Sequence, residues 1–259
     1  YTTYMNIVTL NTWGGRAGKE KLLDFFRQYR DTVDIFCLQE IWNGGHEVRG
    51  TLAGGVVLND IYPELLSEIK EILVDYDCNF QSQFRDYFGL ALFVKKDIKT
   101  MEYGGQFVHK EEGYENPHDI GKHARKIQFV RIGEYATPLT VINFHGLWNG
   151  EGKGDSDDRI LQSQNILSFL KEQTGEVILC GDFNLTPDTE SLRIIGSSGL
   201  RNLISEYGIT STRTSLYAKP VRHASYVFVS DGIQVADFKV LPEEVSDHAA
   251  LLLEINSEV

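Results

Sequence analysis

The chain has 259 residues, of which 37 are Asp or Glu and 25 are Lys or Arg, so its formal net charge is −12. Hydrophobic residues make up 42% of the sequence, too many for a disordered chain, and no apolar run approaches the roughly 18–20 residues of a membrane-spanning helix. The acidic balance disfavours a general nucleic-acid coat protein, but it allows an acidic enzyme that meets polyanions through a local patch or bound metal ions.

Short apolar runs and amphipathic segments alternate along the chain. Strands are expected at 5–10, 33–38, 88–94, 127–132, 139–144, 177–180, 225–229 and 249–255, and helices at 19–30, 64–74 and 159–171. The segment 103–121 is expected to be a long loop. The segment 150–158 is predicted to be flexible and acidic, with Asp residues capping the helix that follows. This order predicts an α/β fold with mixed sheets.

The organisation of the chain is that of one unit. No linker divides it, so we expect a single domain over residues 1–259. Residues 1–4 precede Met5 and are either a remnant of cloning or the end of a missing upstream segment. Cys37 and Cys180 lie in apolar runs without a C-x-x-C pair, which favours buried thiols in a reducing cytoplasm. No basic amphipathic helix or exposed apolar stripe is evident, so we expect a monomer without membrane attachment.

Polar side chains recur where the apolar strands begin or end. They are Asn11, Glu40, His145, Asp182, Asn184, Asp247 and His248. Each alone is typical of an ordinary turn or cap. As a set they are the residue types that hydrolysis of a phosphate ester needs, because carboxylate and amide oxygens suit Mg²⁺ or Mn²⁺ and histidine moves protons near neutral pH. Their spacing does not establish that they converge.

Four short motifs make the sequence recognisable. N-T-W at 11–13, L-Q-E at 38–40, G-D-F-N at 181–184 and S-D-H at 246–248 resemble, in this order, the endonuclease/exonuclease/phosphatase superfamily. That superfamily includes pancreatic-type deoxyribonucleases, abasic-site endonucleases, neutral sphingomyelinases and inositol-polyphosphate phosphatases. The resemblance covers about residues 5–255. It implies a four-layer α/β/β/α sandwich of two mixed sheets flanked by helices.

The resemblance also implies a metal site. Glu40 would be the principal ligand, assisted by Asn11 and Asp247. The cofactor would be Mg²⁺, with Mn²⁺ as the alternative ion.

Roles in catalysis are implied for four further residues. Asp182 would orient or deprotonate the attacking water, and Asn184 would hold the scissile phosphate. His248 would contact the phosphate and act as acid or base. His145 would occupy a second histidine position, which is tyrosine in abasic-site endonucleases, so the chain departs from that type.

Ser225 is a larger departure from the family pattern. The family usually has Asp at this position, where the carboxylate bonds the final histidine. A serine offers one neutral hydrogen bond and cannot stabilise an imidazolium by charge. Neutralising the orienting carboxylate of a serine-protease triad costs on the order of 10⁴ in rate. Natural tolerance, a weakened homologue and a deliberate substitution remain open as explanations.

The net charge is spread unevenly. Residues 207–230 contain no acid, while Arg213, Lys219 and Arg222 supply three positive charges. Arg213 lies in the hydroxyl-rich run T-S-T-R-T-S and is a candidate phosphate contact, with a solvated loop as the alternative. A second, mildly basic segment covers residues 95–131.

Aromatic side chains accompany the candidate site residues. Trp13, Trp42 and Trp148 each lie within a few residues of one, and Trp148 is a candidate substrate contact. Each indole could stack on a base or pack in the core. The basic segment also holds His109, His118 and His123, which lack metal-motif spacing and are expected at the surface.

Three functional hypotheses follow. The first is a metal-dependent phosphodiesterase, nuclease-like on DNA or RNA. The second is a phosphoesterase for a small molecule or lipid headgroup, which the acidic charge favours because few cations are available to follow a long backbone. The third is an impaired homologue that keeps a phosphate site, for which Ser225 is the support.

Overall fold

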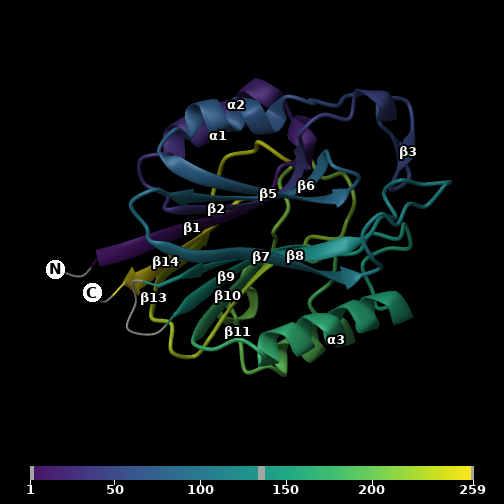
Figure 1. Cartoon of the computed structure of the whole chain (residues 1–259). Helices are drawn as coiled ribbons and strands as arrows, with labels where there is room; N and C mark the ends of the chain where they lie inside the picture. Colours follow the sequence, from purple (N-terminus) through teal and green to yellow (C-terminus); the bar gives the residue numbers. More distant parts are fainter. Residues whose placement is uncertain (1–2, 134–137, 258–259) are drawn as a thin grey trace.

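The molecule is built from two facing β-sheets with helices on their outer surfaces (Figure 1). The computed structural model describes residues 3–133 and 138–257, so Tyr1 and Thr2 of the short segment before Met5 lie outside the described residues. Helices α1 (Lys19–Tyr29) and α2 (Leu65–Ile72) cover one sheet, and α3 (Asp157–Lys171) covers the other. The expected four-layer α/β/β/α sandwich is confirmed.

The first sheet has the strand order β13-β14-β1-β2-β6-β5. The central pair β1 and β2 is parallel, and its other neighbours are antiparallel. Helix α1 joins the parallel pair and buries Leu22, Leu23, Phe25 and Phe26. The strands are β1 (Thr3–Asn11), β2 (Ile35–Trp42), β5 (Tyr76–Phe84), β6 (Phe88–Lys95), β13 (Val235–Val240) and β14 (Leu251–Ser257).

The second sheet has the order β11-β12-β10-β9-β8-β7 and repeats this plan. Its parallel pair is β9 and β10, which α3 connects. The strands are β7 (Thr100–His109), β8 (Arg125–Ile132), β9 (Leu139–His145), β10 (Glu176–Asp182), β11 (Arg201–Asn202) and β12 (Ser225–Val229). The remaining elements are a hairpin of β3 (Leu52–Ala53) and β4 (Val56–Val57), short helices α4 (Glu190–Gly196) and α5 (Leu203–Glu206), and 3-10 turns η1 (Trp13–Gly15) and η2 (His46–Val48).

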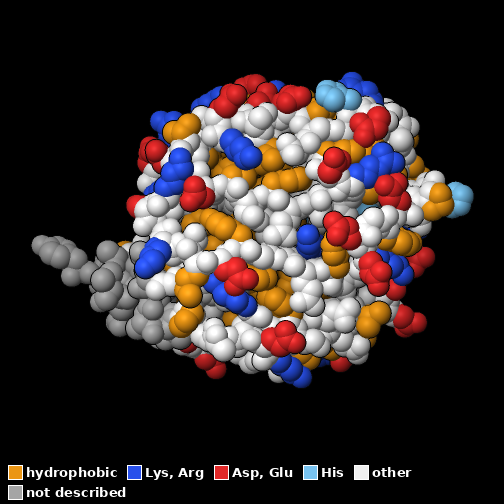
Figure 2. Space-filling view, in the orientation of Figure 1, with side chains coloured by type: hydrophobic (Ala, Val, Ile, Leu, Met, Phe, Trp, Pro, Cys, Tyr) orange, Lys and Arg blue, Asp and Glu red, His pale blue; other side chains and the backbone are white. Residues whose placement is uncertain are grey.

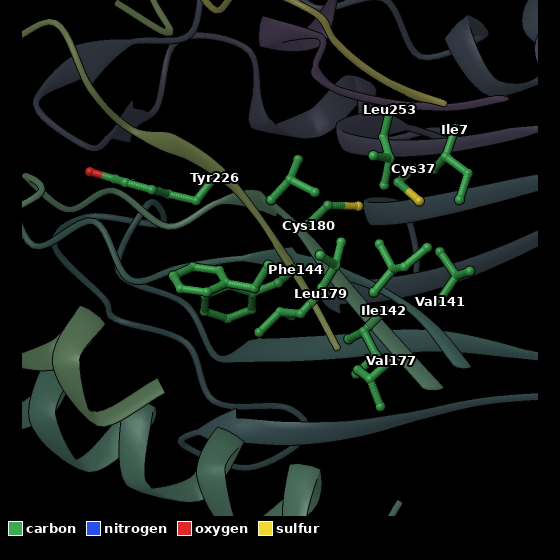
Figure 3. Close-up of a cluster of buried hydrophobic side chains, with 14 of the residues drawn as sticks. Ile7, Cys37, Val141, Ile142, Phe144, Val177, Leu179, Cys180, Tyr226 and Leu253 are labelled. Atoms are coloured by element: carbon green, nitrogen blue, oxygen red, sulfur yellow. The ribbon is translucent and has the colours of Figure 1, made fainter. Parts of the chain in front are cut away.

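The space between the sheets is filled mainly by apolar side chains. Figure 3 shows Ile7 and Cys37 of the first sheet near Cys180 and Val141 of the second. Cys37 and Cys180 are buried free thiols, as predicted. Burial and the neighbouring Cys180 raise the pKa of the Cys37 thiol well above its usual value, so it stays protonated.

A buried amide pair crosses this core. The Nε2 of Gln39 in β2 donates to Oδ1 of Asn143 in β9 at 2.7 Å, and Nδ2 of Asn143 donates to the Leu38 carbonyl at 2.9 Å. Because buried polar groups are costly when unpaired, these bonds fix how the two sheets sit on each other.

The prediction of a long loop over 103–121 is wrong in its first part. Residues 103–109 belong to β7, which pairs with β8 along its length. Gly104 and Gly105, which suggested a loop, lie inside the strand. A Cβ on Gly104 would come within 2.3 Å of the Phe129 ring, so a neighbouring side chain requires the glycine.

Three further sequence predictions are corrected. His109 and His123 are buried, 6% and 2% exposed, whereas His118 is exposed as expected. The helix after 150–158 is capped by Ser156, whose side chain accepts from the Arg159 amide, while Asp157 and Asp158 lie in its first turn. The segment 150–158, expected to be flexible, is anchored by hydrogen bonds from the Arg159 guanidinium to the Gly152 and Gly154 carbonyls.

The surface carries both signs of charge. Figure 2 shows acidic and basic side chains interspersed over the visible face, so the net charge does not gather there in one patch. Within residues 3–133 and 138–257, no helix is long and apolar enough to cross a membrane.

Candidate active site

The two parallel strand pairs deliver polar residues to one edge of the sandwich. Asn11 ends β1, while His145 and Asp182 end β9 and β10 side by side in register. Because parallel strands end at the same edge of a sheet, their terminal side chains meet there. The edge opens into a pocket of about 400 Å³. Its lining includes Glu40, His145, Trp148, Asp182, Asn184, Arg213, Asp247 and His248.

Glu40 reaches this pocket because β2 is irregular. The pairing of β2 with β6 shifts register between Leu38 and Ile41, and Glu40 has a left-handed backbone with φ 58°. A residue after the inward-pointing Gln39 would normally face the opposite side of the sheet. The irregularity re-aims Glu40, and a strained backbone at such a position is typical of functional sites.

The G-D-F-N motif forms a tight connection after β10. Gly181 has φ 140°, and a Cβ there would lie 1.9 Å from the Phe144 carbonyl oxygen, so the close approach of β9 admits glycine alone. The backbone N–H of Asn184 donates to Asp182 Oδ1 at 2.9 Å. Asn184 itself has φ 55°, a conformation that asparagine tolerates. The turn therefore holds Asp182 and Asn184 in a fixed relation.

Asp182 lies at the centre of the site. Its Oδ2 accepts a hydrogen bond from Asn11 Nδ2 at 2.9 Å and lies 3.3 Å from His248 Nε2 and 3.8 Å from His145 Nε2. Burial opposes its ionisation, but His248 and the Lys153 ammonium outweigh burial and lower the pKa of Asp182 below its usual range. Asp182 is therefore an ionised carboxylate at neutral pH.

Ser225 lies directly behind His248. Its Oγ is 3.1 Å from His248 Nδ1, and Thr212 Oγ1 accepts hydrogen bonds from the amides of Ala224 and Ser225. Burial lowers the pKa of His248 well below its ordinary value, with Asp182 opposing that shift. The imidazole is thus held neutral between one hydroxyl and one carboxylate.

His145 lies against a buried arginine. Arg125, at the start of β8, places Nη1 3.3 Å from His145 Nδ1 and 3.4 Å from Nε2, and its Nη2 donates to the Gly121 carbonyl. Burial and the Arg125 charge lower the pKa of His145 to about 3. His145 is therefore neutral at physiological pH and suits hydrogen bonding rather than charge.

Asp247 and Arg213 form a buried ion pair beside Asp182. Arg213 Nη1 donates to Asp247 Oδ2 at 2.7 Å. Burial raises the pKa of Asp247 to about 6, with Arg213 opposing the shift and the carboxylates of Glu40 and Asp182 adding to it. Arg213 does line the pocket, but this guanidinium is engaged by Asp247, and its role in substrate binding stays a prediction.

A family model matches residues 8–248, described as the endonuclease/exonuclease/phosphatase family. The chain belongs to this family. Its members are phosphoester hydrolases that generally use divalent metal ions. No curated protein sequence matches the chain significantly.

Solved structures of the family share the fold at low sequence identity. An endonuclease/exonuclease/phosphatase family protein from Bacteroides thetaiotaomicron has a TM-score of 0.72 at 17% identity, and each chain is covered fully. The mannosyl-6-phosphatase Bt3783 of Bacteroides thetaiotaomicron VPI-5482 has a TM-score of 0.71 at 16% identity, with 97% and 99% covered. D. rerio TDP2, complexed with a single-strand DNA product, has a TM-score of 0.69 at 17% identity, with 98% and 99% covered.

The oxygen-rich side of the pocket fits a hard divalent ion. Within the described residues, no three His, Cys, Asp or Glu side chains already surround one point as ligands. Asp247 Oδ1 is nevertheless buried without a hydrogen-bond partner among those residues, and Glu40 is near enough to raise the Asp247 pKa. Two carboxylates with water at the other positions match Mg²⁺ coordination.

Asn11 faces this oxygen cluster with its amide nitrogen. Its Nδ2 donates to Glu40 Oε1 at 3.0 Å and to Asp182, while its Oδ1 accepts from the Trp13 amide at 2.9 Å. In this arrangement the side chain orients two carboxylates, and its role as a metal ligand stays a prediction.

Two buried cations that line the pocket were not predicted from the sequence. Arg125 and Lys153 both line the pocket, 2% and 5% exposed. Arg125 lies just before the predicted strand 127–132 and Lys153 lies in a glycine-rich segment, so each resembled an ordinary surface charge. The one signal for Lys153 was its position between candidate residues His145 and Asp182.

The three tryptophans divide between core and pocket. Trp42 is buried and packs with Tyr87 and Phe88, although it also reaches the pocket wall. Trp13 and Trp148 are half-buried pocket residues. The Trp148 Nε1–H donates to the Gly54 carbonyl at 2.9 Å, which ties the indole to the β3–β4 hairpin.

Proposed function

We propose that this protein is a divalent-metal-dependent phosphodiesterase that hydrolyses phosphate esters with an activated water. The observation that supports it is the convergence of an ionised Asp182, neutral His248, Asn184 and the Glu40–Asp247 carboxylates on one pocket. These groups supply a proton acceptor, a hydrogen-bond donor for phosphate and hard oxygen ligands.

The residues would divide the reaction as follows. Asp182, fixed by Asn11 and by the Asn184 amide, accepts the proton of the attacking water. The Asn184 side chain binds a phosphate oxygen. The neutral His248 either donates a hydrogen bond to the phosphate or takes up, through its Nε2 3.3 Å from Asp182 Oδ2, the proton that Asp182 has accepted and passes it to the leaving oxygen. Glu40 and Asp247 would hold Mg²⁺, with Mn²⁺ as the alternative, and the bound ion would supply positive charge against the phosphate.

The pocket walls support a nucleic-acid-type substrate. Trp13, Trp148 and Tyr217 bring aromatic rings to the pocket, and aromatic side chains stack on bases. Its volume of about 400 Å³ suits one nucleotide-sized group rather than a duplex. We therefore propose an accessible strand end or unpaired nucleotide of DNA or RNA, a substrate type in keeping with the single-strand DNA product of D. rerio TDP2.

A small phosphoester is the second candidate. The pocket is bounded on one side by the β3–β4 hairpin, and Bt3783, a mannosyl-6-phosphatase, shares the fold. The net charge of −12 also disfavours a protein that follows a long phosphate backbone. A site of this size would accept a sugar phosphate or a lipid headgroup.

A substrate panel with Mg²⁺ and with EDTA tests these proposals. Single-stranded and duplex oligonucleotides, a sugar 6-phosphate and a phosphocholine ester are each supplied to the purified protein. We expect chelator-sensitive cleavage of single-stranded oligonucleotides above the other substrates. Preference for the sugar phosphate or phosphocholine ester would establish the second candidate. Chelator-insensitive hydrolysis would contradict the metal dependence. Metal-dependent phosphate binding without turnover, even with Ser225→Asp, would establish the impaired homologue.

A further inference from the structure

Lys153 lies on a glycine-rich connection that the fold holds in place. The connection follows β9 and precedes α3, and the buried Arg159 guanidinium donates to the Gly152 carbonyl at 2.7 Å and to the Gly154 carbonyl. Asp155 fixes the other end, because its carboxylate accepts from the amides of Glu190 and Ser191 at the start of α4. The Thr186 amide also donates to the Lys153 carbonyl at 2.9 Å. The flexible segment expected from the sequence is therefore anchored at both sides of Lys153.

The ammonium of Lys153 is buried without a carboxylate in ion-pair contact among the described residues. Its side chain lines the pocket, and Nζ donates to Asn184 Oδ1 at 2.7 Å. Of the three donors that an ammonium carries, this is the one engaged within the described part of the chain. Asn184 is the residue proposed to hold the scissile phosphate, so the remaining donors lie at the same place.

Burying a cation without a carboxylate partner destabilises the folded protein, so the presence of such a cation indicates a functional role. Burial lowers the pKa of Lys153 to about 8, with Asp182 opposing the shift. An apolar side chain of similar length would fill the space without this cost. Lysine is rarely buried unless it is paired with an anion. The anionic partner of Lys153 is therefore expected to be a ligand that binds in the pocket.

We propose that Lys153 is a phosphate-binding residue: its ammonium donates to a non-bridging oxygen of the scissile phosphate while it holds Asn184 Oδ1, which leaves for the same group the Asn184 Nδ2 hydrogen that the Gly146 carbonyl, at 3.4 Å, does not use. The assignment rests on the proposed phosphoesterase function and adds a residue to it. Lys153 thereby supplies a positive charge from the protein itself at the phosphate. It comes from the segment after β9 of the second sheet, whereas the Glu40 and Asp247 carboxylates come from the first sheet and the segment before β14.

Lys219 supplies a matched control. It lines the same pocket, and its Nζ lies 5.3 Å from the centre of the Trp148 ring, as the Lys153 Nζ does at 5.7 Å. Lys219 is exposed, however, and has no hydrogen bond to Asn184 among the described residues. Lys153→Met and Lys219→Met therefore remove the same charge from one pocket, once at the phosphate position and once at the rim.

The test is calorimetric titration of the Mg²⁺-loaded protein with inorganic phosphate. We expect Lys153→Met to weaken phosphate binding about 10- to 100-fold, the range of a charge-assisted hydrogen bond, and Lys219→Met to change it less than about fivefold. Equal losses in the two variants, unaltered binding by Lys153→Met, or no phosphate binding by the unmodified protein would each overturn the proposal. Lys153→Gln, which keeps polarity at the site, replaces Lys153→Met if thermal unfolding shows the latter to be misfolded.

An Asn184→Ala background separates contact from positioning. If Lys153 touches phosphate, Lys153→Met still weakens binding about tenfold in this background. No further loss there would mean that Lys153 acts only through Asn184 and would overturn the proposed contact. Turnover of bis(p-nitrophenyl) phosphate is followed in parallel. Lys153-dependent phosphate binding without turnover of any substrate would contradict the proposed function and leave the Lys153 site standing.

Discussion

The two sheets of the sandwich have similar plans but contribute different chemistry to the pocket. Each has a central parallel strand pair joined by a helix, β1–α1–β2 in one and β9–α3–β10 in the other. The first sheet brings Glu40 on β2, and the segment that leads into β14 brings Asp247 and His248. The second brings His145, Asp182 and Asn184, together with the cations Arg125 and Lys153.

This difference shows how a repeated arrangement can serve two purposes. One side gathers carboxylate oxygens that suit a metal ion, while the other holds an ionised base among cations that suit a phosphate. Asn11 links them, because its amide donates to Glu40 and to Asp182.

The largest effect is expected on the second side. Asp182→Asn removes the proposed proton acceptor but keeps its shape, so we expect kcat to fall roughly 10³-fold. Asp188→Asn, an exposed carboxyl nearby in the chain, is the control and should retain activity. Steady-state kinetics on the best substrate of the panel measures both. A fall of less than tenfold for Asp182→Asn would contradict the role of this carboxylate.

A smaller but still large effect is expected on the first side. Glu40→Gln removes a proposed metal ligand, so activity should fall roughly 10²-fold and recover in part at high Mg²⁺. Glu71→Gln on the exposed face of α2 is the control. The dependence of rate on Mg²⁺ concentration checks the prediction. An unchanged Mg²⁺ requirement in Glu40→Gln would show that the ion lies elsewhere.

His248 lies where the two sides meet, and a change next to it is predicted to raise the rate of hydrolysis. Ser225→Asp places a carboxylate next to His248 Nδ1, where Oγ now lies at 3.1 Å, so it can stabilise the charged imidazole. We expect the rate to rise about tenfold, the scale of one charge-assisted hydrogen bond. Ser225→Ala should lower it slightly. A rate unaffected by both changes would place the functional partner of His248 elsewhere.

The buried amide pair between the two sheets, Gln39 and Asn143, leads to a prediction on stability. Asn143→Leu removes one acceptor of Gln39 Nε2 and the donor to the Leu38 carbonyl and to Gln128 Oε1, so the free energy of unfolding should fall by about 2–4 kcal/mol. Adding Gln39→Leu should restore part of this loss, because an apolar pair leaves fewer unsatisfied groups. Urea denaturation measures both variants. A double variant less stable than the sum of the singles would argue against this bridge.

The sequence predicts much of the framework because its periodicity is local. Alternation of apolar strands with the amphipathic segment around Leu22 and Phe26 suffices for β1–α1–β2. β5 and β13 were not predicted because edge strands carry many polar residues and lack a continuous apolar run. The Gly104–Gly105 strand was mistaken for a loop, since the Phe129 ring that requires Gly104 lies on another strand.

The candidate site is less predictable than the framework. Residues at strand ends, such as Asn11 and Asp182, were identified because motif and strand end coincide. Lys153 and Arg125 were missed because burial of a charge depends on segments distant in sequence. The register irregularity that turns Glu40 into the pocket is likewise invisible in the motif L-Q-E.

The division of the pocket into two sides is tested most directly by calorimetric Mg²⁺ titration of Glu40→Gln and Asp182→Asn. We predict that Glu40→Gln loses most of its Mg²⁺ affinity, whereas Asp182→Asn binds Mg²⁺ within a few-fold of the unmodified protein while its kcat falls roughly 10³-fold. Equal loss of Mg²⁺ affinity in both variants, or full affinity in Glu40→Gln, would contradict the account.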